Sequence, residues 1–305
     1  MTSEIVPYAG WQRNLRIAND DTELIVTLDV GPRILSYRTG DGANVFKTFE
    51  EELGGSGEDR WLSRGGHRLW TAPEDEIATY HQDNFPVSHH EESGGWSFVS
   101  NQSEPISIRK ELNVRLESTG SAVSVGHLVT NEGSRPLRLA TWGLSVMDAG
   151  GMAIIPQPPL GEHPRDLLPN RGIVVWPYSD LTDIRFTLGR RFILLQQTEE
   201  GMPFKIGLIH RENWVAYLVG ETLFLKTIEL LPATEYPDGG CNFEMFTNKD
   251  MLELESLGPL QLVEPGASVG HTEHWRLFSG IEAAEITSED ALMEWIKPYI
   301  DQVIR

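Results

Sequence analysis

The sequence predicts an all-β protein, a single large antiparallel β-sandwich with one helix at its C-terminus. Short runs rich in Val, Ile, Leu, Phe and Trp recur up to about residue 278, and 29 glycines and 18 prolines separate them. Helical periodicity does not alternate with these runs, which argues against repeated β-α-β units and a parallel sheet. Because a β-sandwich can exceed roughly 200 residues as one unit, we expect one domain over residues 1–305, with its core within 22–278.

The expected strands are rich in β-branched and aromatic residues and end at turn residues. In chain order they are Thr22–Val30, Ile106–Leu116, Ala122–Thr130, Leu137–Met147, Arg190–Gln196, Phe204–His210, Trp214–Val219, Leu223–Leu230, Asn242–Thr247, Met251–Leu257 and Ser268–Phe278. After them, Leu292, Ile296 and Tyr299 recur at helical spacing and predict a helix over about 288–304. The segments 49–61 and 150–171 lack periodicity, and their length is typical of binding loops or of disorder.

Composition restricts the partners of the chain. It has 25 Lys and Arg against 45 Asp and Glu, a net charge of −20. Such a surface repels polyanions, so we expect neither nucleic acid nor an anionic membrane as a partner. The single cysteine, Cys241, permits no intrachain disulfide, and no run reaches the roughly 18 apolar residues of a membrane-spanning helix. The first residues lack the pattern of a secretion signal, so the expected location is the cytoplasm.

Candidate ligand-binding side chains are densest in residues 64–74, RGGHRLWTAPE. The paired glycines allow the backbone to approach a ligand closely. His67 offers a proton carrier and Arg68 a bidentate donor. Trp70 adds a flat apolar platform and Glu74 an acceptor. This mixture suits a polyhydroxylated ring, whose CH face stacks on an indole while its hydroxyls need donors and acceptors. The alternative is a strand end with a surface salt bridge.

A second polar stretch, residues 242–259, contains Glu244, Glu253 and Glu255. In an extended strand Glu253 and Glu255 point to one face, with their carboxylates about 7 Å apart. Like charges at this spacing can raise one pKa, so that the group can carry a proton near neutral pH. The alternative is a solvated edge of a sheet in an acidic protein.

Two lysines interrupt otherwise apolar strands. Lys205 and Lys226 would be costly to bury without partners, so we expect each to pair with a carboxylate such as Glu244, Glu229 or Glu255. These pairs would either neutralise an acidic sugar and tune a catalytic glutamate, or serve as buried structural ion pairs. Both interpretations remain open.

Five of the remaining histidines fall into three groups. His127 alternates with valines on one strand face and is expected in the core, whereas His210 ends a strand and is expected to line a cavity. A polar segment, residues 81–92, carries three further histidines, but their spacing fits no familiar closed zinc site. We therefore expect neither a metal ion nor a cofactor.

Taken together, these stretches resemble the galactose mutarotase-like (aldose 1-epimerase) superfamily. Residues 251–259, MLELESLGP, followed by LVEPG at 262–266 and a final strand, are similar to its C-terminal signature. Residues 28–36, LDVGPRILS, resemble its early strand pair, and His67 and Arg68 fall where the family places a sugar-binding His and Arg. The matches span residues 22–278 in order and indicate a branch distinct from the well-described epimerases. The resemblance implies a supersandwich fold and a catalytic glutamate at Glu255.

One position departs from the family pattern. The family's second histidine, its proposed general acid, corresponds to Trp142, and an indole cannot donate a titratable proton. The resemblance therefore implies an epimerase-like enzyme in which Glu255 is the base and His67 the acid, acting at an anomeric centre. Expected contacts to the sugar come from a further set of residues: Arg68, Trp70, Glu74, Trp142, Lys205, His210, Lys226 and Glu244.

Two other functions remain open on the same fold. A carbohydrate-binding or sugar-sensing protein without turnover would use Trp70 and Trp142 as stacking platforms. A glycoside hydrolase or lyase would need a further catalytic pair near Arg68. The partner in each case is a small sugar or an oligosaccharide, and the sequence leaves both its identity and the oligomeric state open.

Overall fold

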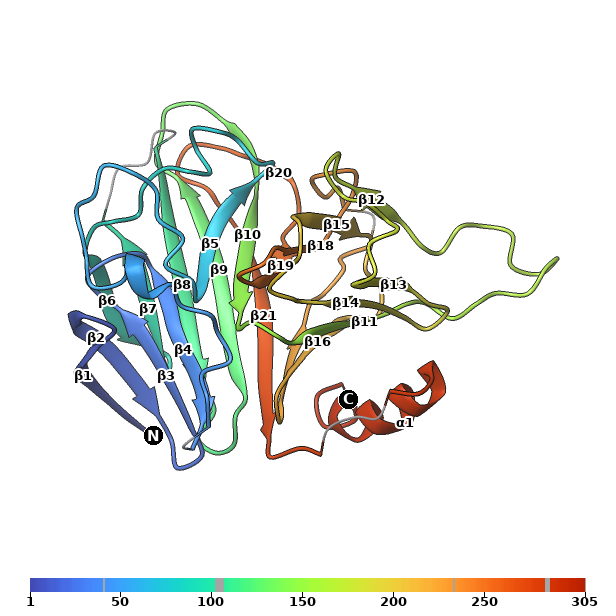
Figure 1. The fold of residues 1–305 in the computed structure, drawn as a ribbon. Coiled ribbons are helices and arrows are strands. Elements are labelled where there is room, and N and C mark those ends of the chain that lie inside the picture. Colours follow the sequence, from blue (N-terminus) through green and yellow to red (C-terminus); the bar gives the residue numbers. More distant parts are fainter. Residues whose placement is uncertain (41, 102–106, 233, 283–285, 305) are drawn as a thin grey trace.

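Two large antiparallel sheets pack against each other and form a β-sandwich (Figure 1). The computed structural model describes residues 1–305 except 41, 102–106, 233, 283–285 and 305. The first sheet contains, in spatial order, β1 (Thr2–Tyr8), β2 (Trp11–Ala18), β3 (Thr22–Thr27), β4 (Arg33–Thr39), β5 (His67–Ala72), β10 (Leu137–Met147), β19 (Leu252–Leu257), β18 (Phe243–Thr247), β15 (Phe204–Leu208) and β12 (Ile173–Val175), with β20 (Gln261–Val263) paired to β10. The predicted fold class is confirmed.

The second sheet is built in the same antiparallel way. Its spatial order is β13 (Phe186–Leu188), β14 (Phe192–Gln196), β11 (Met152–Pro156), β16 (Trp214–Val219), β17 (Thr222–Thr227), β21 (Ser268–Ser279), β9 (Val123–Asn131), β8 (Ile108–Leu116), β7 (Gly95–Ser100) and β6 (Val87–Glu92). Every expected strand corresponds to one of these strands, although the expected start at Ile106 lies outside the described residues. Sheet pairing begins before residue 22, because β1 and β2 continue the first sheet beyond β3.

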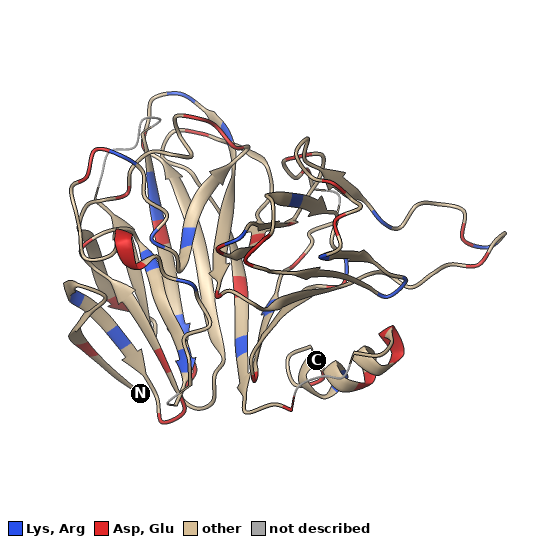
Figure 2. Cartoon of the chain, viewed as in Figure 1, with Lys and Arg blue, Asp and Glu red and all other residues tan. Residues whose placement is uncertain are grey.

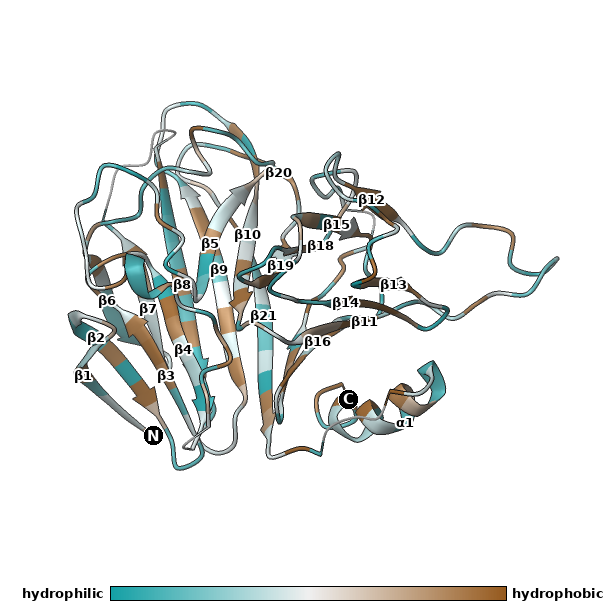
Figure 3. Cartoon of the chain, viewed as in Figure 1, coloured by the Kyte–Doolittle hydropathy of each residue, from teal (hydrophilic) through white to brown (hydrophobic). Residues whose placement is uncertain are grey.

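Alternation along each strand divides the side chains of the first sheet between two faces. On β10, for example, Leu139 and Met147 join the large core between the sheets, whereas Trp142 and Leu144 belong to a separate cluster on the outer face. Figure 3 shows the hydrophobic segments concentrated in the strands and the hydrophilic ones in the connecting loops. The outer face of the first sheet therefore carries its own side-chain cluster, away from the central core.

The connections differ in how they lie on the sandwich. The segment 49–61 contains a short 3-10 helix, η1 (Glu50–Glu52), and lies near the first sheet. The segment between β11 and β12 extends away from both sheets (Figure 1), and it exposes Leu167 and Leu168. Figure 2 shows Lys and Arg scattered among Asp and Glu along strands and loops. Many of these charges pair locally, as Arg16 does with Glu4 and Glu23.

The C-terminal helix α1 (Glu289–Ile300) covers the outer face of the second sheet. Its Leu292 and Ile296 pack against Phe192 and Trp214. The Ser288 side chain caps the helix by accepting a hydrogen bond from the backbone N–H of Ala291 at 3.1 Å. The predicted helix is thus confirmed. Within the described part of the chain, no helix combines the length and apolar character that crossing a membrane requires.

Candidate functional site

Five strands of the first sheet bring a group of polar and aromatic side chains together on its outer face. Arg68 and Trp70 come from β5, and Trp142 from β10. The remaining members come from β19, β18 and β15 and are Glu253, Glu255, Glu244 and Lys205. Trp142 lies directly opposite Trp70, and Glu244 directly opposite Glu255, in the strand register. Side chains paired in this way are close neighbours on one face.

Two cations hold the carboxylates of this group. Lys205 Nζ lies 2.8 Å from Glu244 Oε2 and 3.0 Å from Glu255 Oε2. Trp142 Nε1 donates a hydrogen bond to the same oxygen of Glu255 at 2.9 Å. Arg68 NH2 donates to Glu253 Oε1 at 3.1 Å. All of these side chains are buried, so the ion pairs act in a medium of low dielectric constant.

Aromatic rings enclose both cations. The Arg68 guanidinium lies 4.4 Å from the ring centre of Trp70 and 5.4 Å from that of Trp61. Lys205 Nζ lies 4.5 Å from the ring centre of Trp142 and 4.8 Å from that of Trp176. These are cation–π contacts. Trp61 and Trp176 belong to loops, so the loops complete a site whose floor is the sheet.

Partly exposed side chains lie beside the buried group. Tyr80 is 41% exposed. Its ring packs on Trp70 and its hydroxyl donates to Glu74. Asp238 interacts with Glu244 and also lines a surface cavity of about 740 Å³, together with Pro73 and the Gly239-Gly240 turn. Asp238 thus links an open cavity to the buried carboxylates. A second cavity of about 740 Å³ is lined by other residues, among them Trp214 and Lys297.

Burial shifts the protonation of these groups. It raises the pKa of Glu244 to about 8, because desolvation and the nearby Glu255 outweigh the attraction of Lys205. Burial likewise raises the pKa of Glu253 to about 7, against the effect of Arg68. Burial opposes the charge of Lys205, but Glu255 and Glu244 outweigh it and raise the Lys205 pKa. The site therefore combines a permanent cation with carboxyl groups that titrate near neutral pH.

Several buried polar atoms of the site have no hydrogen-bond partner among the described residues. Two are donors, Arg68 Nε and Trp61 Nε1, and two are acceptors, Glu244 Oε1 and Glu255 Oε1. Buried polar groups in proteins almost always have a partner. The mixture of donors and acceptors next to indole rings fits a ligand that offers both hydroxyl hydrogens and hydroxyl oxygens.

His67 is not part of this group, and the expectation that it would share a pocket with Arg68 and Glu255 is wrong. Because neighbouring residues of a strand point to opposite faces, His67 faces the second sheet while Arg68 faces outward. His67 Nδ1 is bonded to Ser145 Oγ at 2.9 Å, and its Nε2 to Nε2 of His127 at 2.7 Å. Burial, followed by the charges nearby, lowers the His67 pKa well below its usual value.

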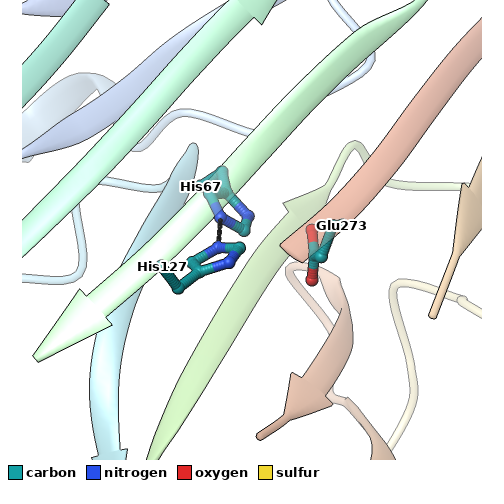
Figure 4. A group of neighbouring side chains, drawn as sticks. All are labelled: His67, His127 and Glu273. Carbon is teal, nitrogen blue, oxygen red and sulfur yellow. Dashed lines mark hydrogen bonds between the residues drawn. The ribbon is translucent and has the colours of Figure 1, made fainter. Parts of the chain in front are cut away.

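The inner face instead carries a hydrogen-bonded network that joins the two sheets. His67, His127 and Glu273 place their ligand atoms within 4.8 Å of one another (Figure 4). Glu273 accepts hydrogen bonds from Lys226 at 2.8 Å, from Trp275 Nε1 at 2.6 Å, and from a serine hydroxyl. The side chains present therefore supply both a charge partner and donors to this carboxylate, and the group functions as an inter-sheet network.

Two further candidates lie away from the outer face. Lys226 pairs with Glu273 and with the carbonyl of Leu254, and not with any of the carboxylates expected for it. His210 is buried beside β15, where its ring nitrogen bonds the carbonyl of Trp214 at 2.9 Å. Neither side chain reaches Glu255. The predicted pairing of Lys205 with Glu244 and Glu255 is confirmed, and so is the core position of His127.

The paired glycines before β5 have a structural role. Gly65 and Gly66 have φ of +78° and +75°. A Cβ atom on Gly65 would lie 2.0 Å from the carbonyl oxygen of Lys47, and one on Gly66 would lie 2.3 Å from that of Ile34. The glycines therefore let the chain pass close to its own backbone, which positions β5.

Sequence reasoning missed the residues that loops contribute. Trp61, Tyr80, Trp176 and Asp238 complete the site, but none lies in an expected strand. The available signal was Trp61 in the segment 49–61, whose length is typical of binding loops or of disorder, and the Trp-Pro-Tyr sequence that begins at Trp176.

Comparison with known proteins identifies the fold. The sequence matches no protein-family model and no curated protein. The structure is similar to that of a galactose mutarotase-like protein from Lactobacillus casei ATCC 334, with a TM-score of 0.57 and 12% identity over 87% of this chain and 100% of the other. It is also similar to a galactose mutarotase related enzyme from Lactobacillus acidophilus, with a TM-score of 0.52 and 10% identity over 88% and 98%.

A third solved structure leads to the same assignment. A protein of Escherichia coli K12, provisionally named an aldose 1-epimerase, aligns with a TM-score of 0.53 and 13% identity over 87% of this chain and 98% of the other. The alignments cover nearly the whole length of each relative, so the similarity is not confined to a few strands. The chain therefore has the β-sandwich fold of the galactose mutarotase-like proteins, as its sequence motifs predicted.

Proposed function

We propose that this protein binds a sugar on the outer face of its first sheet and interconverts the anomers of that sugar, with Glu255 as the base. The observation that carries this proposal is the set of buried, unpartnered donors and acceptors beside indole rings. Arg68 Nε and Trp61 Nε1 would donate to sugar oxygens, whereas Glu255 Oε1 would accept from a sugar hydroxyl. The shared fold supports the same substrate class by analogy.

The surroundings of Glu255 suit the role of a base. Its Oε2 is held by Lys205 and by the indole of Trp142, at 3.0 Å and 2.9 Å. These two contacts fix the carboxylate and leave Oε1 for the substrate. In the proposed reaction Glu255 removes the proton of the anomeric hydroxyl, and the ring C1–O5 bond breaks as O5 is protonated. A positioned base contributes typically about 10² to 10⁴-fold to the rate.

His67 is not the acid of this proposal, because its ring lies on the opposite side of the sheet. The acid has to come from the outer face, where the described titratable groups other than the cations are carboxyl groups, tyrosines and the thiol of Cys241. Trp142 itself has no titratable proton. Its place in the site is that of a hydrogen-bond donor and an aromatic wall.

The second candidate function is sugar binding without turnover. The presence of Trp142 at the position of the family's second histidine favours it, because one member of the usual acid–base pair is replaced. Binding and turnover are separated by measuring both on the same preparation.

The test combines a panel of aldoses, studied by calorimetry and thermal shift, with polarimetry of freshly dissolved anomers. We expect at least one aldose to bind and to reach anomeric equilibrium faster with the protein than without it. Glu255→Gln should keep the binding and lose more than about 10²-fold in rate. Glu200→Gln, at an exposed position, is the matched control and should behave like the wild type. Binding of sugars without any acceleration would establish the second function, and no binding to any sugar would contradict both.

A further inference from the structure

We propose that Glu244 is the second catalytic residue of this site, the acid that protonates the sugar ring oxygen while Glu255 takes the proton of the anomeric hydroxyl. This inference rests on the proposed function and names a group for the role that His67 does not occupy.

The carboxyl groups of Glu244 and Glu255 are neighbours on the outer face of the sheet. Glu244 and Glu255 are directly opposite each other on adjacent strands, β18 and β19, and point to the same face. One ammonium group, Lys205 Nζ, contacts an oxygen of each at 2.8 Å and 3.0 Å. The second oxygen of each, Oε1, has no hydrogen-bond partner among the described residues. A common cation thus holds the two carboxyl groups next to each other.

The buried site contains more carboxyl groups than cations. Three buried carboxyl groups lie close together, those of Glu244, Glu253 and Glu255, and the partly buried Asp238 lies beside Glu244. The cations held among them are Lys205 and Arg68. Full ionisation would leave an excess of negative charge out of contact with water, which is strongly unfavourable. At least one of these groups therefore keeps its proton at neutral pH.

Hydrogen bonding decides which carboxyl group carries that proton. Glu253 accepts a hydrogen bond from Arg68, and Glu255 accepts from both Trp142 and Lys205. The contacts of Glu255 stabilise its anion, whereas burial raises the Glu253 pKa to about 7 in spite of Arg68, so Glu253 is only partly ionised at pH 7. The carboxyl group of Glu244 shares a side-chain hydrogen bond with that of Asp238, which requires a proton between them, and beyond that Glu244 has the ion contact with Lys205. Its raised pKa, about 8, agrees with a neutral group at pH 7.

The other titratable groups that face Glu244 do not compete for this role. Cys241 precedes β18, and its thiol pKa is raised by burial and by the charges of Glu244 and Asp238. Tyr178, from the loop after β12, has a pKa raised to about 12 by burial. The Asp238 pKa is also raised by burial. Asp238 lies between Glu244 and the surface cavity.

The proposed step is balanced in protons and electrons. The proton of O1 moves to Glu255, and the O–H electron pair forms the C1=O1 double bond. The electron pair of the breaking C1–O5 bond takes the proton of Glu244 and becomes the O5–H bond. Rotation about C1–C2 by half a turn exposes the other face of the carbonyl. The same transfers in reverse close the ring and restore both carboxyl groups.

Infrared spectroscopy and kinetics on the full chain test this inference together. Between about pH 7 and pH 8 we expect the wild type to show the carbonyl band of a protonated carboxylic acid, and Glu244→Gln to lose most of it. Because an amide resembles a neutral carboxyl group, this variant should fold normally, and its melting temperature is the check. Its kcat should fall by about 10² to 10⁴-fold with KM little changed. In the wild type kcat should decline above about pH 8.

Glu253→Gln removes a carboxyl group from the same face and is the comparison for the infrared band, which it should keep. Glu200→Gln, at an exposed position, is the control for the rate and should keep the wild-type kcat and its decline at alkaline pH. Loss of the band in Glu253→Gln instead, or full kcat in Glu244→Gln, would overturn the role of Glu244. A wild type that accelerates mutarotation of no aldose would overturn the proposed function along with it, so the two failures are distinguishable.

Discussion

Trp142 donates its indole N–H to Glu255 Oε2 at 2.9 Å, and this bond joins β10 to β19 in the middle of the outer face. Trp142→Phe removes the donor and keeps most of the ring. A buried hydrogen bond to a charged acceptor contributes about 1.5–3 kcal/mol, so we expect an unfolding free energy lower by about that amount. Urea unfolding measures it, and Trp70→Phe, on the facing strand, is the control for loss of indole bulk. Equal effects of the two variants would show that this bond contributes nothing specific.

Lys205 is the shared partner of two buried carboxylates, so its removal leaves both unpaired. Lys205→Met should lower the unfolding free energy by about 3–5 kcal/mol at pH 8. The loss should be smaller at pH 5, where Glu244, with its pKa raised to about 8, is neutral. Urea unfolding at the two pH values checks this, with the exposed Lys249→Met as the control. A loss that does not change with pH would argue against charge as the cause.

The burial of His210 should account for part of the pH dependence of the unfolding free energy. Burial lowers its pKa to about 4 in the folded protein, against about 6.5 in the unfolded chain. Between these values only the unfolded chain binds the proton, so this histidine lowers the unfolding free energy by about 1.4 kcal/mol per pH unit as the pH falls. Glu253 and Glu244 act in the opposite direction, because their pKa values are raised in the fold.

The contribution of His210 is isolated by comparison with a variant. His210→Gln should show a shallower fall in unfolding free energy between about pH 6 and pH 5 than the wild type, and the change of slope is the readout. Urea unfolding at a series of pH values provides it. Parallel curves for the two proteins would mean that His210 is not held neutral.

The small space around Gly143 indicates that the inter-sheet network is tightly packed. A Cβ atom there would lie 2.8 Å from His127 Nε2 and 3.2 Å from Glu273 Oε1. Gly143→Ala should therefore displace the network and lower the unfolding free energy by about 1–3 kcal/mol, measured by thermal unfolding. Gly126→Ala, whose nearest contact would be the Asn113 Cβ at 3.3 Å, should cost less. An unchanged melting temperature for Gly143→Ala would show that the sheets have room to separate.

The parts of the fold that the sequence predicted are those in which local pattern and burial agree. β10 and β16 have the predicted bounds, because long runs of apolar residues define them. The N-terminal strands were missed because β1 is exposed along most of its length and has no strong apolar alternation. Its place is determined by pairing with β2, which local sequence does not encode.

The site was predicted in part, for a comparable reason. Strand alternation placed Glu253 and Glu255 on one face correctly. Applied to β5, the same rule separates His67 from Arg68, but the motif resemblance had grouped them. The loop residue Trp61 was out of reach, because its approach to Arg68 depends on how a long connection folds over the sheet.

The opposite directions of His67 and Arg68 have an evolutionary consequence. Two adjacent residues belong to two separate groups of side chains. His67 helps to hold the two sheets together, and Arg68 belongs to the outer cluster. Residues that share no contacts usually have additive effects on stability. Natural variation at position 68 or 70 can therefore change the outer cluster while the histidine network, and with it the contact between the two sheets, is inherited unchanged.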